Sequence, residues 1–573
     1  MKPRRAPTSA SSRRSESEVV SRTLPLRIVP LGGLGEFGLN CMVIESPDDA
    51  VVVDCGLMFP DKHMLGVDRV IPDVTYLRQL GAKVKGIVLT HGHEDHLGAL
   101  PYVLPEFRLP VWAPRFSAAL LRAKLREYPA AAGSRIETYE PGQPWRLGDF
   151  EIEGIHVTHS FVDACALVLR IGDRTLVHSG DFKMDPAPID GRPTDVDRLR
   201  QVGDEGVTLL MSDSTNAERR GATRSESLVR GYLEPIFART RGRIIVSTFA
   251  SHIHRIAAVV SLCERFGRRI AFVGRSMNNN VALATETKHL GIPGDLLVDR
   301  RQAEGLARER VCVVATGCQG EARSALMRIA MGEMPKLAVA GGDAVVLSSN
   351  VIPGNDRAVS AVISRFFKAG AEVYYQAVTD VHVSGHAARE DLRTMIEAVR
   401  PRYFVPLHGE YRNLEHHARL AVECGVEAGN CFRLVSGDVL EIDADGARRA
   451  GSVPAGRVLV DGERVGEVDA AVLRDRRHIS QDGVVLVIVA VSSQTGELVS
   501  GPEFVTRGLG SSAAEDDRIE TAAAAVVDRV RELSAGAPID EAELAEEVRL
   551  VVRRHLRREL GLRPVVVPYL MQL

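Results

Sequence analysis

The stretch His91-Gly-His93-Glu-Asp95-His96 decides the fold of this chain. It directly follows the apolar run Gly86-Ile-Val-Leu-Thr90, which has the composition of a strand. The first two histidines point the same way from an extended loop, whereas the aspartate and the last histidine lie one turn further on. Open α/β sheets gather ligand-binding groups at the carboxyl ends of their strands. We therefore expect this stretch to supply ligands to two neighbouring metal ions.

The same pattern recurs at the ends of three other apolar runs. They are Ile155-His-Val-Thr158 before His159, Thr175-Leu-Val-His-Ser-Gly180 before Asp181, and Tyr403-Phe-Val-Pro-Leu407 before His408. Neutral imidazole and carboxylate bind Zn²⁺ at about 2.0–2.2 Å, and a catalytic zinc keeps one position open for water. Two ions about 3.5–4 Å apart stabilise both the attacking and the leaving oxygen of a displacement. A lone histidine is usually a core or surface residue, but this many candidate ligands at strand ends favour a two-metal centre.

Three sets of motifs carry a resemblance to a known family. The first, typical of the metallo-β-lactamase superfamily, is Asp54 in Val51-Val-Val-Asp-Cys-Gly56, the HxHxDH stretch, His159 and Asp181. The second, typical of β-CASP nucleases, is Met211-Ser-Asp-Ser-Thr-Asn216, His382-Val-Ser-Gly-His386 and Pro406-Leu-His-Gly-Glu410. The third is similar to strings of bacterial ribonuclease J: Leu31-Gly-Gly-Leu-Gly-Glu36, Thr248-Phe-Ala-Ser251, Thr316-Gly-Cys-Gln-Gly-Glu321 and Ile352-Pro-Gly-Asn355. The resemblance covers the chain from residue 24 to 573.

The resemblance implies an α/β fold with three parts. A metallo-β-lactamase αββα sandwich is interrupted by an inserted β-CASP α/β domain and followed by a small α/β C-terminal domain. The residue patterns agree, because strand-like runs separated by Gly and Pro turns give way to alternating helices and parallel-type strands after residue 213. The expected segments are a disordered basic tail (1–22), the sandwich (23–213), the β-CASP domain (214–376), the completion of the sandwich (377–450), a linker (451–466) and the C-terminal domain (467–573).

The resemblance also implies a role for each site residue. One zinc would be bound by His91, His93 and His159, the second by Asp95, His96 and His408, and both by Asp181. Asp54 would orient the ligand histidines. Asp95, Asp181 and His386 would be catalytic, and His386 would stabilise or protonate the departing 3′-oxygen. The loop that would grip a substrate phosphate consists of His382, Val383, Ser384, Gly385 and His386.

The function implied is that of a metal-dependent ribonuclease. It would degrade RNA 5′→3′ from 5′-monophosphate ends, with endonuclease activity as well, in mRNA decay and rRNA maturation. It would use two Zn²⁺ per subunit, with Mn²⁺ as the alternative. Its partners would be single-stranded RNA, copies of itself in a homodimer or homotetramer, and other RNA-decay proteins.

Three alternatives stay open from the sequence. A β-CASP nuclease acting on DNA is disfavoured by the long ribonuclease J strings. A small-molecule thioester or lactone hydrolase has no need of the inserted domain. An inactive RNA-binding scaffold is disfavoured by the complete set of ligands.

Composition limits where the protein acts and how it meets RNA. The formal net charge is −3, so a nucleic-acid surface must be a local groove. The eight cysteines are scattered without a CxxC pair, which fits a reducing compartment. Apolar runs stay shorter than the roughly 18 residues of a membrane span, and the N-terminus has no hydrophobic signal core. We therefore expect a cytoplasmic protein without a membrane partner.

Several residues depart from the family pattern or are discounted as ligands. His252, Cys318 and Leu39 stand where ribonuclease J usually has other residues, and none of them is an expected metal ligand. The adjacent pair His416-His417 is expected on a helix surface. The glycine-rich run 32–38 resembles a dinucleotide-binding loop, but without a βαβ unit it is expected to be a tight loop beside the metal site.

Overall fold

In the computed structural model the described residues are 25–352, 354–509, 513–534 and 540–573, so the expected basic tail at 1–22 lies outside them. The chain divides into two compact units. The first contains the residues up to Met58 and Pro72–Gly456, and the second contains Phe59–Ile71 and Arg457–Leu573. Among the described residues, no helix is both long and apolar enough to cross a membrane.

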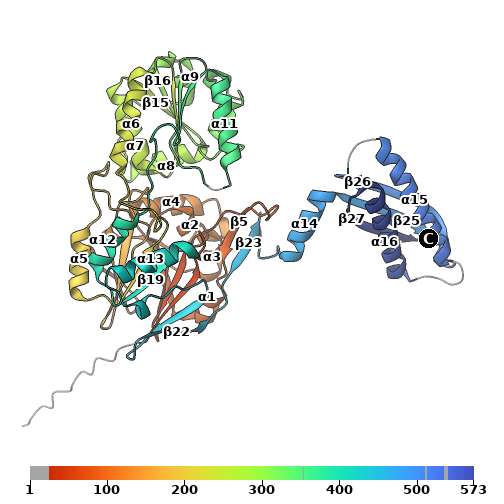
Figure 1. The fold of residues 1–573 in the computed structure, drawn as a ribbon, viewed down its shortest axis with the longest axis horizontal. Coiled ribbons are helices and arrows are strands. Elements are labelled where there is room, and N and C mark those ends of the chain that lie inside the picture. Colours follow the sequence, from red (N-terminus) through yellow and green to blue (C-terminus); the bar gives the residue numbers. More distant parts are fainter. Residues whose placement is uncertain (1–24, 353, 510–512, 535–539) are drawn as a thin grey trace, which may run out of the picture. The chain divides into compact units, whose positions relative to one another are not determined.

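Two sheets packed face to face form the sandwich of the first unit (Figure 1). The eight-stranded sheet has the order β22 (Ala447–Ser452), β21 (Asp438–Ile442), β1 (Leu26–Gly32), β3 (Cys41–Glu45), β4 (Ala50–Val53), β6 (Val84–Val88), β7 (Val111–Ala113) and β8 (Ile136–Thr138). The six-stranded sheet has the order β19 (Tyr403–Leu407), β13 (Leu209–Asp213), β12 (Arg174–His178), β11 (Cys165–Ile171), β10 (Phe150–His156) and β9 (Trp145–Leu147). Alternate side chains of the two sheets, such as Val51, Val53, Leu167 and Leu169, share one core.

Helices cover the sandwich and complete its layers. The outer face of the six-stranded sheet, with Val168, Val177 and Phe404, packs against α5 (Val196–Glu205), α12 (Arg389–Val399) and α13 (Tyr411–Glu423). The helices that accompany the other sheet are α1 (Thr75–Leu80), α2 (Glu94–Leu97), α3 (Leu100–Phe107) and α4 (Arg115–Leu125), of which α4 contacts β7 and β8.

The inserted domain is built on a five-stranded, wholly parallel sheet (Figure 1). Its order is β15 (Arg269–Val273), β16 (Val311–Ala315), β14 (Ile244–Ser247), β17 (Ala344–Leu347) and β18 (Glu372–Tyr374). The helices are α6 (Glu226–Arg239), α7 (Ile253–Arg265), α8 (Arg275–Glu286), α9 (Arg300–Gly305), α10 (Ala325–Ala330) and α11 (Asp356–Lys368). Val246 and Val314 face α6 and α7, whereas Ile245 and Val313 face α10 and α11. Because both faces are covered, the strands are continuous apolar runs.

The chain returns from the inserted domain to the sandwich through one strand pairing. Strand β19 pairs in parallel with β13, with Leu407 opposite Asp213, and β13 pairs in parallel with β12. The carboxyl ends of these three strands therefore lie at the same edge of the sheet. This order places the residues after Leu407 next to those after β13 and one strand away from those after β12.

The second unit has two small sheets. β5 (Arg69–Pro72), β23 (Arg457–Asp461) and β24 (Arg464–Val465) form one, so the segment expected to be a linker contains paired strands. After α14 (Ala470–Asp482), the strands β26 (Leu498–Arg507), β25 (Val484–Val491) and β27 (Val565–Gln572) form the other, with α15 (Ala513–Ser534) and α16 (Glu541–Leu560) packed on one face. Asp540 caps α16 by accepting hydrogen bonds from the backbone N–H groups of Ala542 and Glu543. Where the boundaries between the expected domains fall stays a prediction.

Candidate metal centre and active site

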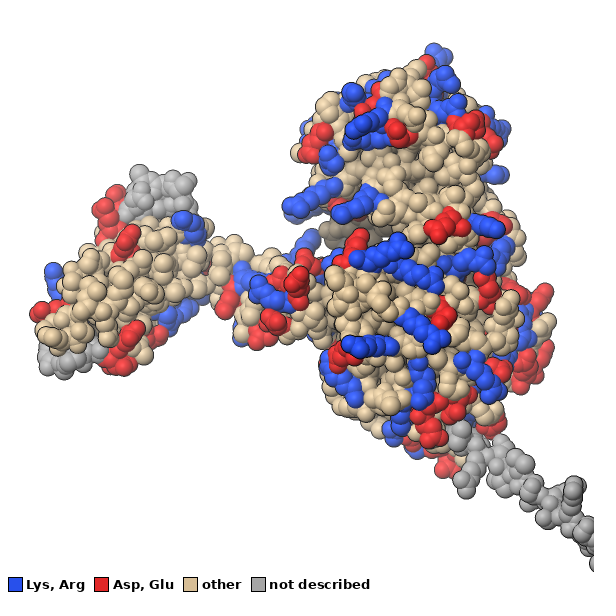
Figure 2. Space-filling model, turned by 180° about the vertical axis from the view of Figure 1, so that it is seen from behind, with Lys and Arg blue, Asp and Glu red and all other residues tan. Residues whose placement is uncertain are grey.

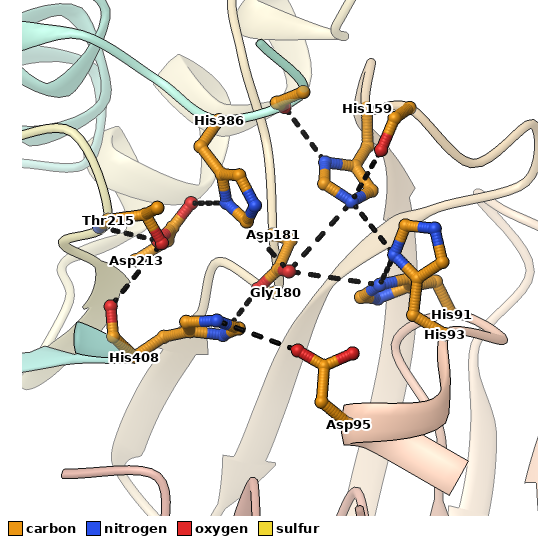
Figure 3. Close-up of polar contacts among 12 residues, drawn as sticks. His91, His93, Asp95, His159, Gly180, Asp181, Asp213, Thr215, His386 and His408 are labelled. Atoms are coloured by element: carbon orange, nitrogen blue, oxygen red, sulfur yellow. Dashed lines mark hydrogen bonds and ion pairs between the residues drawn. The ribbon is translucent and has the colours of Figure 1, made fainter. Parts of the chain in front are cut away.

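Loops at the strand ends bring the candidate ligands to one place (Figure 3). His91 and His93 lie between β6 and α2, and Asp95 and His96 lie in α2. The other three follow β10, β12 and β19: His159, Asp181 and His408. Gly56 allows the chain after β4 to pass α2, since a Cβ there would meet the carbonyl oxygen of Asp95 at 1.6 Å.

The first cluster of candidate ligands consists of three imidazoles and a carboxylate. His93 Nδ1 lies 3.0 Å from His91 Nε2 and 3.2 Å from His159 Nε2. Two nitrogens that each lie about 2.0–2.1 Å from one tetrahedral ion are roughly 3.4 Å apart, so the three imidazoles suit a single ion. Asp181 Oδ2 lies 3.8 Å from both His91 Nε2 and His159 Nε2.

The second cluster shares Asp181 with the first. His96 Nε2 lies 3.2 Å from Asp181 Oδ2 and 3.7 Å from Asp95 Oδ2. His408 Nε2 lies 3.7 Å from Asp95 Oδ2, and His408 Nδ1 lies 3.0 Å from Asp181 Oδ1. These last two atoms are buried and contact each other, and no other described residue gives either of them a hydrogen bond. A cation between them would satisfy both, so the residues fit a divalent metal at this position.

Electrostatics separates the two groups of histidines. Burial lowers the pKa of His91 and His159 well below its usual value and that of His93 to about 4, so these rings are neutral and can bind metal. Burial opposes a charge on His96 and His408 too, but the carboxylate of Asp181 outweighs it and raises their pKa. A site that holds protons so firmly is anionic, and a metal ion would displace those protons.

Buried hydrogen bonds fix the orientation of two ligand rings. Asp54 Oδ2 lies 2.7 Å from His96 Nδ1, and Asp54 also accepts from the backbone N–H and the hydroxyl of Thr90. His159 Nδ1 donates to the carbonyl oxygen of Gly385 at 2.8 Å. Each contact leaves the Nε2 atom facing the centre. A Cβ at Gly385 would meet Ser160 Oγ at 2.6 Å, so glycine permits this close approach.

Sequence reasoning missed four residues around the centre. His386 Nδ1 lies 2.9 Å from Asp213 Oδ2 and 3.8 Å from Asp181 Oδ2. Burial alone would lower the pKa of His386. The nearby carboxylates of Asp213 and Asp181 more than offset this effect and raise the pKa to about 9. Asp213 is the first of the four missed residues. Asn216 donates to Ser384 Oγ and to the carbonyl oxygen of His386, and Thr223 donates to the same carbonyl. The fourth is Asn40, whose Nδ2 lies 3.2 Å from His96 Nε2. Asp213 and Asn216 both lie in the motif Met211-Ser-Asp-Ser-Thr-Asn216, which was the available signal, whereas Thr223 and Asn40 had none.

The expected phosphate loop borders a cavity of about 1050 Å³. His382, Val383 and Ser384 line it, although most of the Val383 side chain packs into the core of the inserted domain. Burial lowers the pKa of His382 to about 3, and its buried Nδ1 has no hydrogen-bond partner among the described residues. The other lining residues include one acid, Asp356, and several neutral polar side chains, together with these arginines and apolar or aromatic residues: Arg219, Arg220, Arg224, Val351, Ile363, Phe367 and Tyr375. In Figure 2, Lys and Arg side chains gather along a hollow in the larger unit, as a local basic groove requires.

None of the residues discounted as ligands belongs to a candidate metal cluster of the described residues, and one expected location needs a correction. His252 is buried with Nε2 3.8 Å from Glu226 Oε2, Cys318 lines the cavity, and Leu39 is buried. The expectation that His416-His417 lies on a surface is wrong for His417, which is fully buried against Ser214 and Phe404. The glycine-rich run does lie beside the centre, because the carbonyl of Gly33 accepts from the backbone N–H of His408.

Comparisons with known proteins agree with this architecture. Four family models match: the metallo-beta-lactamase superfamily (34–221), the ribonuclease J beta-CASP domain (241–366), the Zn-dependent metallo-hydrolase RNA specificity domain (370–429) and the ribonuclease J C-terminal domain (471–573). Among curated relatives, ribonuclease J of Synechocystis sp. is 39% identical, covering 96% of this chain and 87% of its own. Ribonuclease J of Thermus thermophilus is 37% identical (96% and 95%), and ribonuclease J2 of Bacillus subtilis is 34% identical (96% and 98%).

One solved structure supports the fold alone. It is a protein of unknown function from Enterococcus faecalis, with a TM-score of 0.53 at 14% identity, and it covers 73% of this chain and 99% of its own.

A metallo-β-lactamase sandwich with a β-CASP insertion and a buried His/Asp cluster at its strand ends defines a class of metal-dependent hydrolases. Within that class, the chain belongs to the ribonuclease J family. It is therefore a metal-dependent ribonuclease that binds RNA and uses a divalent metal.

Proposed function

We propose that this ribonuclease removes nucleotides 5′→3′ from RNA with a 5′-monophosphate and also cuts internally, in mRNA decay and rRNA maturation. The observation that carries the proposal is the position of the His382–His386 loop. One end of this loop lines the large cavity, and at the other end His386 Nδ1 lies 3.8 Å from Asp181 Oδ2 of the metal clusters. A chain end held in the cavity would therefore present a nearby phosphodiester to the metal centre.

We assign two zinc ions per subunit to the centre, with manganese as the alternative. His91, His93 and His159 would hold one ion, Asp95, His96 and His408 the other, and Asp181 both, while Asp54 orients His96. When bound, the ions would activate water and neutralise charge on the reacting phosphate. Asp95 and Asp181 would supply the negative charge that keeps the ions in place, and this is the catalytic role that we propose for them.

His386 would serve the departing 3′-oxygen. Its raised pKa of about 9 keeps the ring protonated at neutral pH. Asp213 occupies Nδ1, so Nε2–H is left to donate a hydrogen bond or a proton. Charge developing on a leaving oxygen is stabilised by a donor that is positioned in advance.

The cavity suits single-stranded RNA. Ser384 and the backbone around Gly385 can donate hydrogen bonds to a phosphate, and neutral His382 lies beside them. The three arginines would neutralise backbone phosphates. Phe367 and Tyr375 offer rings on which bases stack without sequence preference.

Self-association as a homodimer or homotetramer is proposed for the three-stranded sheet of the second unit. Its helices cover one face only. On the other face the register places Leu486 of β25 between Val505 and Val567, and Val567, Tyr569 and Met571 are exposed. An apolar face of this kind is typical of an interface. Other RNA-decay proteins as partners and a cytoplasmic location stay proposals; the free cysteines fit the latter.

The product ladder tests the proposal. Purified protein with Zn²⁺ or Mn²⁺ would be given RNA labelled at either end, bearing a 5′-monophosphate or a 5′-triphosphate, with single-stranded DNA of the same sequence as the control. We expect mononucleotides from the 5′-monophosphate RNA, slower release from the triphosphate, and a minority of internal cuts. Release that starts from the 3′ end, or equal rates on RNA and DNA, would contradict the proposal.

A further inference from the structure

Arg255 is the largest fully buried side chain among the described residues. It lies on α7 of the inserted domain and is not one of the candidate metal ligands. Its guanidinium forms a two-point contact with Glu226, in which Nε donates to Oε1 and Nη2 donates to Oε2 at 2.9 Å. Nη1 donates to two backbone carbonyls, that of Val381 at 2.8 Å and that of Ser348 at 3.1 Å. Each of the three nitrogens of this buried cation therefore has a protein acceptor.

The Val381 carbonyl immediately precedes the loop that begins at His382. It accepts a second hydrogen bond from Ser348 Oγ at 2.6 Å, and Ser348 Oγ is itself bonded to Arg255. The far end of the loop is held separately, because His159 Nδ1 donates to Gly385 O. The His382 end therefore depends on Arg255 and Ser348.

Glu226 connects this tie to the metal side of the sandwich. Its backbone N–H donates to Asp185 Oδ2 at 2.9 Å, and Lys183 Nζ lies 3.3 Å from the same oxygen. The backbone N–H of Lys183 donates to the carbonyl of Thr158 at 2.8 Å, and Thr158 precedes the candidate ligand His159. All of these residues are buried. Contacts thus run without a gap from the start of the loop to the metal side.

We infer that Arg255, with Glu226 as its counter-ion, is a positioning residue that fixes the His382 end of the substrate loop relative to the metal centre. The inference rests on the proposed role of that loop in holding RNA. Arginine suits the task because its planar fork offers donors in fixed directions, whereas lysine keeps the charge but cannot bind Glu226 and Val381 with that geometry. Misplacing a substrate-holding group by about 1 Å can lower a rate by about 100-fold.

The test compares Arg255→Lys with a matched control. Arg268 is also a buried arginine of the inserted domain that donates to backbone carbonyls, including that of Gly242 at 2.8 Å, but no contact links it to the loop. Arg268→Lys therefore reports the cost of changing a buried guanidinium alone. Ser348→Ala removes the second donor to Val381 with a smaller change. For each protein we would measure metal content, melting temperature, hydrolysis of bis(p-nitrophenyl) phosphate, and kcat and KM on 5′-monophosphate RNA.

The small diester needs the metal centre but not the loop, which separates positioning from a general loss of structure. We expect Arg255→Lys to keep its metal and its diester rate within about twofold, and to lose about 10- to 100-fold in kcat/KM on RNA. Ser348→Ala should lose RNA activity in the same selective way, and Arg268→Lys should not. Equal losses on both substrates, or an RNA rate matching that of Arg268→Lys, would overturn the inference. If Arg255→Lys fails to fold, a parental RNA rate in Ser348→Ala overturns it. If the proposed 5′→3′ polarity is wrong, the product ladder of the wild-type protein will show it. The ratio of RNA hydrolysis to diester hydrolysis tests the role of Arg255 separately, because it does not depend on whether RNA is cut from an end or internally.

Discussion

His386 and Asp213 come from opposite ends of the inserted domain, and their side chains meet with Nδ1 2.9 Å from Oδ2. Asp213 ends the strand that leads into the domain, and His386 lies in the loop that leads out of it. The contact contributes, together with Asp181, to the raised pKa of the ring, and it leaves Nε2 as the nitrogen that Asp213 does not engage.

Asp213→Asn should narrow the pH range of activity from its alkaline side. The folded-state pKa of His386, about 9, is raised above its usual value by Asp213 and Asp181, so the protonated ring is lost as pH rises through that value. Removing the charge of Asp213 lowers this pKa, and the protonated ring is then lost at a lower pH. Rates measured between pH 6 and 10 at saturating metal should show the alkaline limb moving towards neutrality. An unmoved limb would mean that another group controls it.

His386→Ala should separate catalysis from metal binding. The seven proposed ligands are untouched, so both ions should remain. The rate should still fall by about 10²–10⁴-fold, the usual contribution of a positioned proton donor. Elemental analysis beside single-turnover rates decides the matter. Loss of a metal would make His386 a ligand, and a full rate would remove it from the mechanism.

His93→Ala and Asp95→Ala should each abolish hydrolysis without unfolding the protein, because the two residues belong to different clusters around Asp181. His416→Ala, at a partly exposed histidine outside both clusters, is the control and should be fully active. Metal content and RNA hydrolysis should be measured together. A near-parental rate in either variant with added zinc or manganese would refute the two-metal assignment.

Asp163 should make stability depend on pH. Its buried carboxylate accepts from the backbone N–H groups of Phe116 and Ser117 at the start of α4, yet burial raises its pKa to about 6. Because the folded-state pKa lies above the unfolded one, ionisation costs stability as pH rises from about 4 to 6. The free energy of unfolding of Asp163→Asn, measured relative to that of the wild type, should therefore be about 1–3 kcal/mol higher at pH 7.5 than at pH 4.5. Urea unfolding at both values measures this, and a pH-independent difference would contradict it.

Tyr569→Glu should dissociate the proposed oligomer. Tyr569 is 57% exposed on the uncovered face of the three-stranded sheet. Association through this face would bury the new carboxylate, and the cost of burying that charge would oppose association. Arg553→Glu on the solvated face of α16 is the control. Light scattering after size exclusion should show a smaller particle for the first variant only. Unchanged mass would place the interface elsewhere.

The clusters were predictable from sequence because their residues sit at the ends of strongly apolar strands, and parallel pairing of β12, β13 and β19 must align those ends. The roles of Asn216 and Thr223 could not be predicted from the sequence, because they depend on contacts with a loop far along the chain. The burial of His417 could have been found, since three residues after Leu414 it falls on the inner face of α13. The pairing of β23 with β5 was hidden, because its partner lies far back in the sequence.

The late arrival of His408 has a consequence for biosynthesis. Its strand can add to β13 only after the ribosome has made the whole inserted domain, since that domain lies between the two. An emerging chain would thus hold one cluster of imidazoles early but would gain the last candidate ligand late, on closing a long-range contact. A nascent or truncated chain that ends before β19 would lack a complete centre. The order of the chain would in this way delay the hydrolytic activity until the inserted domain has been made.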